Sequence, residues 1–137
     1  MKKLTFLIFF LLLSYITFGQ NIKVNKNTKL LVYYFHITNR CKTCTSIEAA
    51  TIKTLDDYYK TQLDSGIIVF ESFNVEIPEN KTLCEKYQAY GATLALTKIE
   101  FGKEVNIDDL TNFAFSKIHS GEDFMMGLKT KIDEWIK

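Results

Sequence analysis

Residues 30–44 read LLVYYFHITNRCKTC. The first six form a continuous run of aliphatic and aromatic side chains, which is typical of a strand buried on both faces. Two cysteines two residues apart, Cys41 and Cys44, follow after a short loop. From Cys41 onward the apolar residues recur at helical spacing. The stretch therefore predicts a buried strand, a loop, and a helix that begins at the cysteine pair.

The predicted helix ends at Ser65-Gly66, because serine and glycine there interrupt the helical pattern. A second apolar strand is expected over residues 67–75. The side of the helix that should face the core carries Cys44, Ile47, Thr51, Leu55, Tyr58 and Gln62, with Ile52, Tyr59 and Leu63 beside it. This amphipathic pattern predicts that the helix packs against the sheet that holds both strands.

The rest of the chain continues the alternation of strands and helices. A short helix is expected up to Gly91, and a strand over residues 93–101 leads through a turn at Gly102-Lys103 into a short strand at 104–106. Asp108 is a plausible N-cap for a helix over residues 109–118. Ser120-Gly121 separates that helix from a last one over residues 122–136. The predicted order is β-α-β-α-β-β-α-α.

The cysteine pair carries the clearest chemical signal. Two thiols at this spacing, where a strand leads into a helix, favour thiol–disulfide exchange. Cys41 at the helix N-terminus would have its thiolate favoured by the free N–H groups and the helix dipole, and the charges of Arg40 and Lys42 would act in the same direction. Cys44 lies one turn into the helix, close enough to close a disulfide. Cys84 is distant in sequence and is interpreted as a buried apolar thiol, or else as a third, resolving or metal-binding thiol.

This element order, with CxxC at the start of the first helix, resembles the thioredoxin fold over residues 30–137. Tyr90-Gly91-Ala92 before a strand and Phe101-Gly102-Lys103-Glu104 at a hairpin are similar to the thioredoxin pattern. The resemblance implies an α/β, three-layer fold with a central mixed four-stranded sheet and helices on both faces. It also implies that Cys41 is the attacking nucleophile and Cys44 the resolving thiol of a redox-active disulfide.

Two departures from the thioredoxin pattern lie at the expected active site. Thioredoxins carry Trp-Cys-Gly-Pro-Cys, whereas Lys42-Thr43 separate the cysteines here. Thioredoxins also place a cis-proline before the third strand, where it helps to shape the substrate groove and keeps metal off the dithiol. The matching positions are Ala92 and Thr93, and without a proline the peptide bond is expected to be trans. The missing proline favours access of a soft metal to the thiols.

A third departure concerns proton transfer. Thioredoxin has a buried acid on its first strand that helps to move the proton of the second cysteine, but no Asp or Glu lies between Gln20 and Cys41 here. Two residues could replace it. His36, at the end of the predicted strand, could instead be a capping or packed histidine. Glu48, one turn beyond Cys44, could instead be a solvated helix residue.

The N-terminus predicts export. Residues 1–19 combine Met-Lys-Lys, an apolar run over residues 4–18 and a glycine, a pattern typical of a secretory signal peptide; an uncleaved anchor is the alternative. Residues 20–29 would be a polar lead-in to the domain at 30–137. The mature chain would lose two of the 17 basic residues and none of the 16 acidic ones, so its net charge would be −1. A nucleic acid partner is therefore not expected.

Together these patterns predict an exported, periplasmic thiol–disulfide oxidoreductase. Its partner would be a protein with a disulfide or dithiol, and it would need no dissociable cofactor. We expect a monomer without a stable membrane span after cleavage. One alternative is an accessory protein that binds a soft ion, Cu(I) or arsenite, through Cys41 and Cys44. Another is a redox-inactive interaction domain.

Overall fold

The computed structural model describes residues 24–137, so the predicted signal peptide at 1–19 and part of the lead-in lie outside the described residues. The expected order of strands and helices is confirmed, with one short 3-10 helix added. The elements are β1 (Leu30–His36), α2 (Lys42–Asp64), β2 (Ile68–Asn74), η1 (Pro78–Asn80), α3 (Lys81–Lys86), β3 (Thr93–Glu100), β4 (Lys103–Asp109), α4 (Thr111–Lys117) and α5 (Gly121–Trp135).

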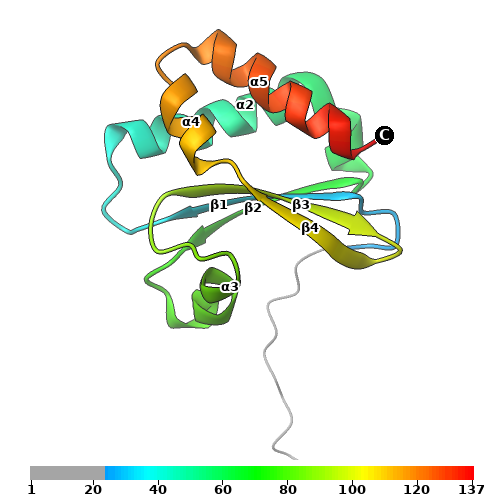
Figure 1. The fold of residues 1–137 in the computed structure, drawn as a ribbon, viewed down its shortest axis with the longest axis horizontal. Helices are drawn as coiled ribbons and strands as arrows, with labels where there is room; N and C mark the ends of the chain where they lie inside the picture. Colours follow the sequence, from blue (N-terminus) through cyan, green and yellow to red (C-terminus); the bar gives the residue numbers. More distant parts are fainter. Residues whose placement is uncertain (1–23) are drawn as a thin grey trace, which may run out of the picture.

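The strands form one mixed sheet in the order β2-β1-β3-β4. β1 runs parallel to β2 and antiparallel to β3, and β3 forms an antiparallel hairpin with β4. Thr93 at the start of β3 pairs with Phe35 near the end of β1. The loop before α2 and the turn before β3 therefore lie at the same edge of the sheet (Figure 1).

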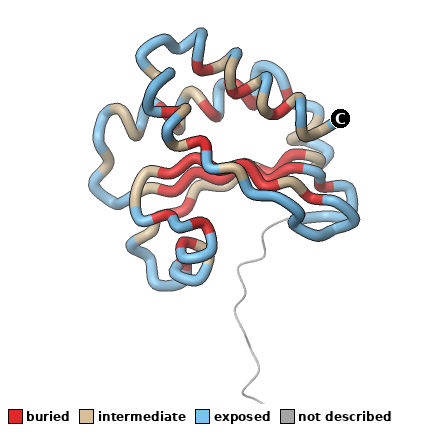
Figure 2. Tube along the Cα trace, viewed as in Figure 1, coloured by how far each residue is buried: buried red, intermediate tan, exposed pale blue. Residues whose placement is uncertain are grey.

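Helices cover both faces of the sheet, as the sequence predicts. α2, α4 and α5 lie on one face and α3 on the other (Figure 1). Alternate residues of β1 belong to two separate hydrophobic clusters: Leu30, Val32 and Tyr34 to the cluster beneath α2 and α5, and Leu31, Tyr33 and Phe35 to the cluster beside α3. Continuous buried stretches run along β1 and β3 in the middle of the sheet (Figure 2). Burial on both faces explains the continuous apolar run of β1.

The core-facing side of α2 differs from the expected one in its second half. Tyr59 is 3% exposed, whereas Tyr58 is 43% exposed. Tyr59 has non-helical backbone angles (φ −132°, ψ 21°), and the helix is kinked there. Its hydroxyl donates a hydrogen bond to the Asp133 carboxylate of α5, 2.6 Å away. The kink therefore turns the neighbouring tyrosine, rather than the predicted one, toward the core.

The segment that follows β3 also differs from the sequence prediction. β4 extends from Lys103 to Asp109 and is exposed along almost its whole length. Asp108 consequently lies in the strand and does not cap α4, whose N-cap is Leu110. Asp109 instead bonds the start of α4, because its Oδ1 accepts a hydrogen bond from the Thr111 N–H at 2.8 Å. Pairing with β3 continues to Asp109, and the sequence predicts a shorter strand because these side chains do not alternate between buried and exposed.

Within residues 24–137, no helix has the length and apolar character needed to span a membrane.

Candidate redox-active site

The two cysteines form a disulfide at the start of α2, with their Cα atoms 5.1 Å apart. Cys41 is the N-cap residue, in an extended conformation (φ −72°, ψ 158°), and its Sγ accepts a hydrogen bond from the Cys44 N–H at 3.0 Å. Cys41 is exposed and Cys44 is half-buried. The predicted placement is therefore confirmed, with the accessible sulfur at the end of the helix where negative charge is favoured.

Arg40 and Glu48 form an ion pair beside this helix start. Arg40 Nη1 bonds Glu48 Oε2, and Nη2 lies 3.4 Å from Oε1. The two side chains are 24% and 15% exposed, so the pair is largely shielded from solvent. Burial is the largest single influence and would raise the pKa of the Glu48 carboxyl, but the hydrogen bond from Arg40, the polar hydroxyl of Ser72 and the charge of Arg40 together outweigh it, so the pKa lies below its usual value. Glu48 is thus not a solvated helix residue.

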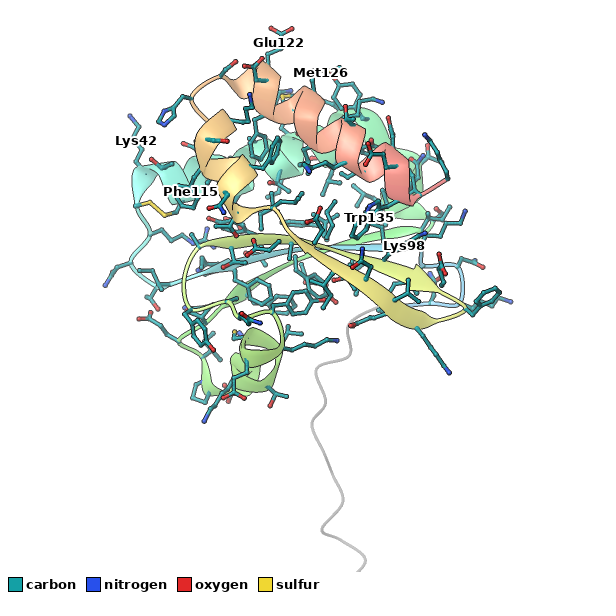
Figure 3. All side chains as sticks on the ribbon, in the orientation of Figure 1. Lys42, Lys98, Phe115, Glu122, Met126 and Trp135 are labelled. Atoms are coloured by element: carbon teal, nitrogen blue, oxygen red, sulfur yellow. A yellow bond between two sulfur atoms is a disulfide. The ribbon has the colours of Figure 1, made fainter. Side chains whose placement is uncertain are left out.

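The pair also changes the role expected of Arg40. Its guanidinium charge is largely compensated by the carboxylate of Glu48, so it contributes less positive potential at Cys41 than the sequence suggested. Lys42 remains the exposed positive charge beside the disulfide, and Figure 3 shows it at the N-terminal end of α2. Glu48, four residues after Cys44 on the same helix, lies on the same side as Cys44.

We expect Arg40→Gln to raise the pKa of the Glu48 carboxyl, because burial would then act with no opposing guanidinium. Carbon-13 NMR titration of the Glu48 side chain measures this. The wild-type pair stabilises the fold at a pH above the unfolded-state pKa of the carboxyl, and this contribution is lost as the pH falls through the lower folded-state pKa. Arg40→Lys, which keeps the charge but loses the two-pronged donor, should give a smaller rise. An unchanged Glu48 pKa in Arg40→Gln would contradict the prediction.

Tyr34 is a site residue that the sequence analysis assigned only to the core. Its hydroxyl donates a hydrogen bond to the main-chain oxygen of Cys44 at 2.8 Å. Burial, and then the negative charge of Glu48, raise the pKa of Tyr34 to about 12, so the hydroxyl keeps its proton at neutral pH. The alternation along β1 could have indicated this contact, because Tyr34 points to the same side as Leu30 and Val32, toward α2.

His36 ends β1 at the same edge of the sheet. Its Nδ1 lies 2.9 Å from the carbonyl oxygen of Ile37, which accepts a hydrogen bond only from a protonated Nδ1. The ring also stacks on Tyr34, with the centroids 6.5 Å apart. The structure thus gives His36 the contacts of a packed residue at the end of β1, with its ring against Tyr34 and its Nδ1 facing the main chain of Ile37. Its role in proton transfer stays a prediction.

Ala92 and Thr93 lie at the edge of the sheet where the disulfide is found, because Thr93 pairs with Phe35. Ala92 is half-buried and Thr93 is 8% exposed. All peptide bonds of residues 24–137 are trans. The position of this turn agrees with the groove that the resemblance implied, and its contact with a substrate stays a prediction.

A hollow of about 240 Å³ lies directly beside the residues between the cysteines. It is lined by Lys42, Thr43 and Ser46 from α2, and by Ile118 and His119 from the turn between α4 and α5. The break between the last two helices therefore brings an exposed histidine close to Lys42 and Thr43, the two residues between the cysteines. The sequence could not place His119 here, because nothing local indicates that this turn packs against the start of α2.

Cys84 belongs to a different part of the fold. It is 5% exposed and packs in the cluster beside α3, on the opposite face of the sheet from α2. Burial raises the pKa of its thiol. The interpretation of Cys84 as a buried apolar thiol agrees with its location in this cluster. Residues 24–137 hold no group of three or more His, Cys, Asp or Glu side chains that could bind one metal ion.

The fold is similar to solved thioredoxin structures. No protein-family model and no curated protein sequence matches the chain. The N21Q mutant thioredoxin of Halobacterium salinarum superposes with a TM-score of 0.53 at 19% identity, covering 87% of each chain. Fasciola hepatica thioredoxin has a TM-score of 0.45 at 19% identity, covering 69% of this chain and 83% of its own. The chain thus has a thioredoxin-like fold that carries a CxxC disulfide.

Proposed function

We propose that the protein exchanges disulfides with partner proteins through Cys41 and Cys44. The observation that carries this proposal is the position of the disulfide, whose exposed sulfur caps the N-terminus of α2. A thiolate at that place is stabilised by the helix start, both when it attacks and when it leaves. The thioredoxin-like fold supports the proposal, because it places the turn at Ala92 and Thr93 at the same edge of the sheet.

The exchange proceeds in two steps. The thiolate of reduced Cys41 attacks one sulfur of the partner disulfide, so that a mixed disulfide forms and one partner thiolate leaves. Cys44 then loses its proton and attacks Cys41 Sγ, which re-forms the Cys41–Cys44 disulfide and releases the second partner thiolate. The partner gains two electrons and the dithiol loses them. A dithiol reductant resets the protein, and the same steps run in reverse when the partner is oxidised.

The surrounding residues would position the cysteines. Tyr34 holds the main chain of Cys44 through its hydroxyl, at the first turn of the helix. Glu48, in its ion pair with Arg40, places a shielded carboxylate one turn from Cys44. Lys42 and His119 line the hollow beside the disulfide and would contact the partner protein.

Reduction of insulin by dithiothreitol tests the proposal. The wild-type protein should accelerate the precipitation of insulin chains above the rate with dithiothreitol alone. Cys41→Ser should return the rate to that background, because it removes the nucleophile. Of the thiols that remain in residues 24–137, Cys44 is half-buried and Cys84 is buried. Cys84→Ser is the matched control and should keep the wild-type rate.

A wild-type rate equal to the background would contradict thiol exchange and leave the two alternatives. Titration of the reduced protein with Cu(I) or arsenite separates them, since stoichiometric binding that Cys41→Ser abolishes would indicate a soft-ion site on the dithiol. The absence of both activities would indicate an interaction domain that keeps CxxC as a local disulfide.

Export is proposed on the pattern of residues 1–19 alone. It is consistent with a disulfide in the folded protein, because disulfides persist in oxidising compartments such as the periplasm. The intact mass of protein recovered from the exported fraction should match a chain that begins at Gln20. Recovery of the full-length chain from the membrane fraction would contradict cleavage.

A further inference from the structure

A cleft of about 760 Å³ lies at the opposite end of the sheet from the disulfide. It is lined by residues 26–29 before β1, residues 98–102 of the β3–β4 hairpin, Ile67, and Trp135 with Lys137 at the end of α5. Figure 3 shows Trp135 and Lys98 at this end of the molecule, with Lys42 at the other. A volume of this size is typical of clefts that hold small molecules.

The rim of the cleft is positively charged. Four lysines line it, at positions 26, 29, 98 and 137, against a single acidic side chain, Glu100. Lys98 Nζ lies 2.7 Å from Glu100 Oε1, and Lys29 Nζ contacts the main-chain oxygen of Ile136 at 3.4 Å. Across the whole chain 17 basic residues face 16 acidic ones, whereas four basic residues face one acidic residue in this lining.

Apolar side chains accompany the lysines. Ile67, Ile99 and Trp135 line the cleft, and Phe101 at the tip of the hairpin stands fully exposed. Trp135 is the one tryptophan of the whole chain. A ligand that fits this lining would have an apolar body and a negative charge.

The backbone at Phe101 gives an independent reason to expect a ligand. The two residues between β3 and β4 both have positive φ, 52° at Phe101 and 73° at Gly102. Such a turn favours asparagine followed by glycine, and a bulky side chain in the left-handed region is strained. Phe101 gains no burial in return. A strained and exposed aromatic residue at the mouth of a cleft is the kind of outlier that indicates function.

We propose that this cleft binds a small amphipathic organic anion, whose charged group bonds the lysines and whose apolar body packs on Phe101 and Trp135. The site is separate from the disulfide and does not depend on the proposed thiol exchange. Electrostatic attraction would bring the anion to the rim, and burial of its apolar body would hold it.

Octanoate is a suitable probe, because it is ionised at neutral pH and carries a short apolar chain. Binding to the full-length protein is measured by isothermal titration calorimetry and by the emission of Trp135. Two matched compounds separate the contributions: 1-octanol keeps the chain without the charge, and acetate keeps the charge without the chain. Octanoate should bind more tightly than either and shift the Trp135 emission. Equal binding of octanoate and 1-octanol, or no shift of the emission, would overturn the proposal.

Phe101→Asn distinguishes a functional from a structural role of the aromatic ring. Asparagine relieves the strained turn, so the melting temperature should rise by roughly 2–5 °C. The affinity for octanoate should nevertheless fall, by about fivefold, because apolar contact area is lost. An unchanged affinity for octanoate in this variant would overturn the proposal. A lower melting temperature would also overturn it, because that result would show that the Phe101 side chain stabilises the fold.

Lys26→Gln tests the charged rim and Lys117→Gln is its control. Both lysines are exposed, but Lys117 lies on α4, outside the cleft. Lys26→Gln should weaken octanoate binding by about two- to fivefold, as expected for one exposed charge pair. Lys117→Gln should leave the affinity unchanged. Equal effects of the two substitutions on octanoate binding would contradict a specific role for the lysines of the rim. The rate of insulin reduction should be unchanged in the Phe101, Lys26 and Lys117 variants.

Discussion

Cys44→Ser is expected to stop the exchange after its first step and leave the protein covalently bound to its partner. Cys41 keeps its place at the exposed N-cap of α2, so it still attacks a partner disulfide. The serine hydroxyl that replaces the second thiol cannot attack a disulfide sulfur, so the mixed disulfide is not resolved. Each protein molecule should therefore react once.

Non-reducing electrophoresis and intact mass measure this product. Reduced Cys44→Ser mixed with a disulfide-linked model peptide should gain the mass of one peptide thiol, and dithiothreitol should remove it. Peptide mapping should place the adduct on Cys41. The double variant Cys41→Ser/Cys44→Ser is the control, and it should form no adduct, because the remaining Cys84 is 5% exposed. An adduct of equal yield in the double variant, or one mapped to Cys84, would overturn the assignment of the nucleophile.

Phe124→Ala is expected to lower the free energy of unfolding by about 3–5 kcal/mol, the usual cost of removing a large side chain from a packed core. Phe124 is fully buried in α5 and lies in the cluster shared by α2, α4 and α5. Its ring packs on Phe113 of α4, with the centroids 5.6 Å apart. The cavity left by alanine would loosen both C-terminal helices from the sheet.

Urea denaturation followed by circular dichroism gives the change in free energy. Phe115→Ala is the matched control, because it removes the same side chain from the neighbouring helix at a position that is 38% exposed. It should cost less than about 1 kcal/mol, as is usual for surface positions. Similar losses in the two variants would contradict the packing described here.

The parts of the fold that were predicted correctly are those governed by local patterns. The apolar run of β1 predicted burial on both faces, and β1 is a central strand between β2 and β3. The cysteine spacing predicted a helix start, and Cys41 is the N-cap. Ser120-Gly121 predicted the boundary before the last helix, where the Ser120 side chain accepts a hydrogen bond from the Asp123 N–H.

The errors arise where distant residues decide the structure. Tyr59 replaces Tyr58 in the core at the kink of α2, where its hydroxyl bonds Asp133 on another helix. A period of 3.6 residues cannot foresee such a kink. The extent of β4 was underestimated because an exposed strand at the edge of a sheet has no buried face to produce alternation.

The candidate site was predicted only in part, because some of its contacts also join residues that are distant in the sequence. The two cysteines are recognised from their spacing. The partner of Glu48 was missed, because Arg40 lies on the loop before α2 and the pair forms only when the helix begins at Cys41. The contacts of Tyr34 and His119 depend on how the sheet and the α4–α5 turn meet the start of α2, and only tertiary structure supplies that information.

The exposed β4 strand has a consequence for how copies of the protein behave when they are concentrated. It forms one outer border of the sheet, where unpaired main-chain groups could pair with a strand of another molecule. Lys103, Glu104, Asp108 and Asp109 place charges of both signs along this border. A second copy approaching edge to edge would have to remove water from these charges before any backbone bond formed. The polar sequence of β4, which made the strand difficult to recognise, thereby disfavours edge-to-edge aggregation of the sheet.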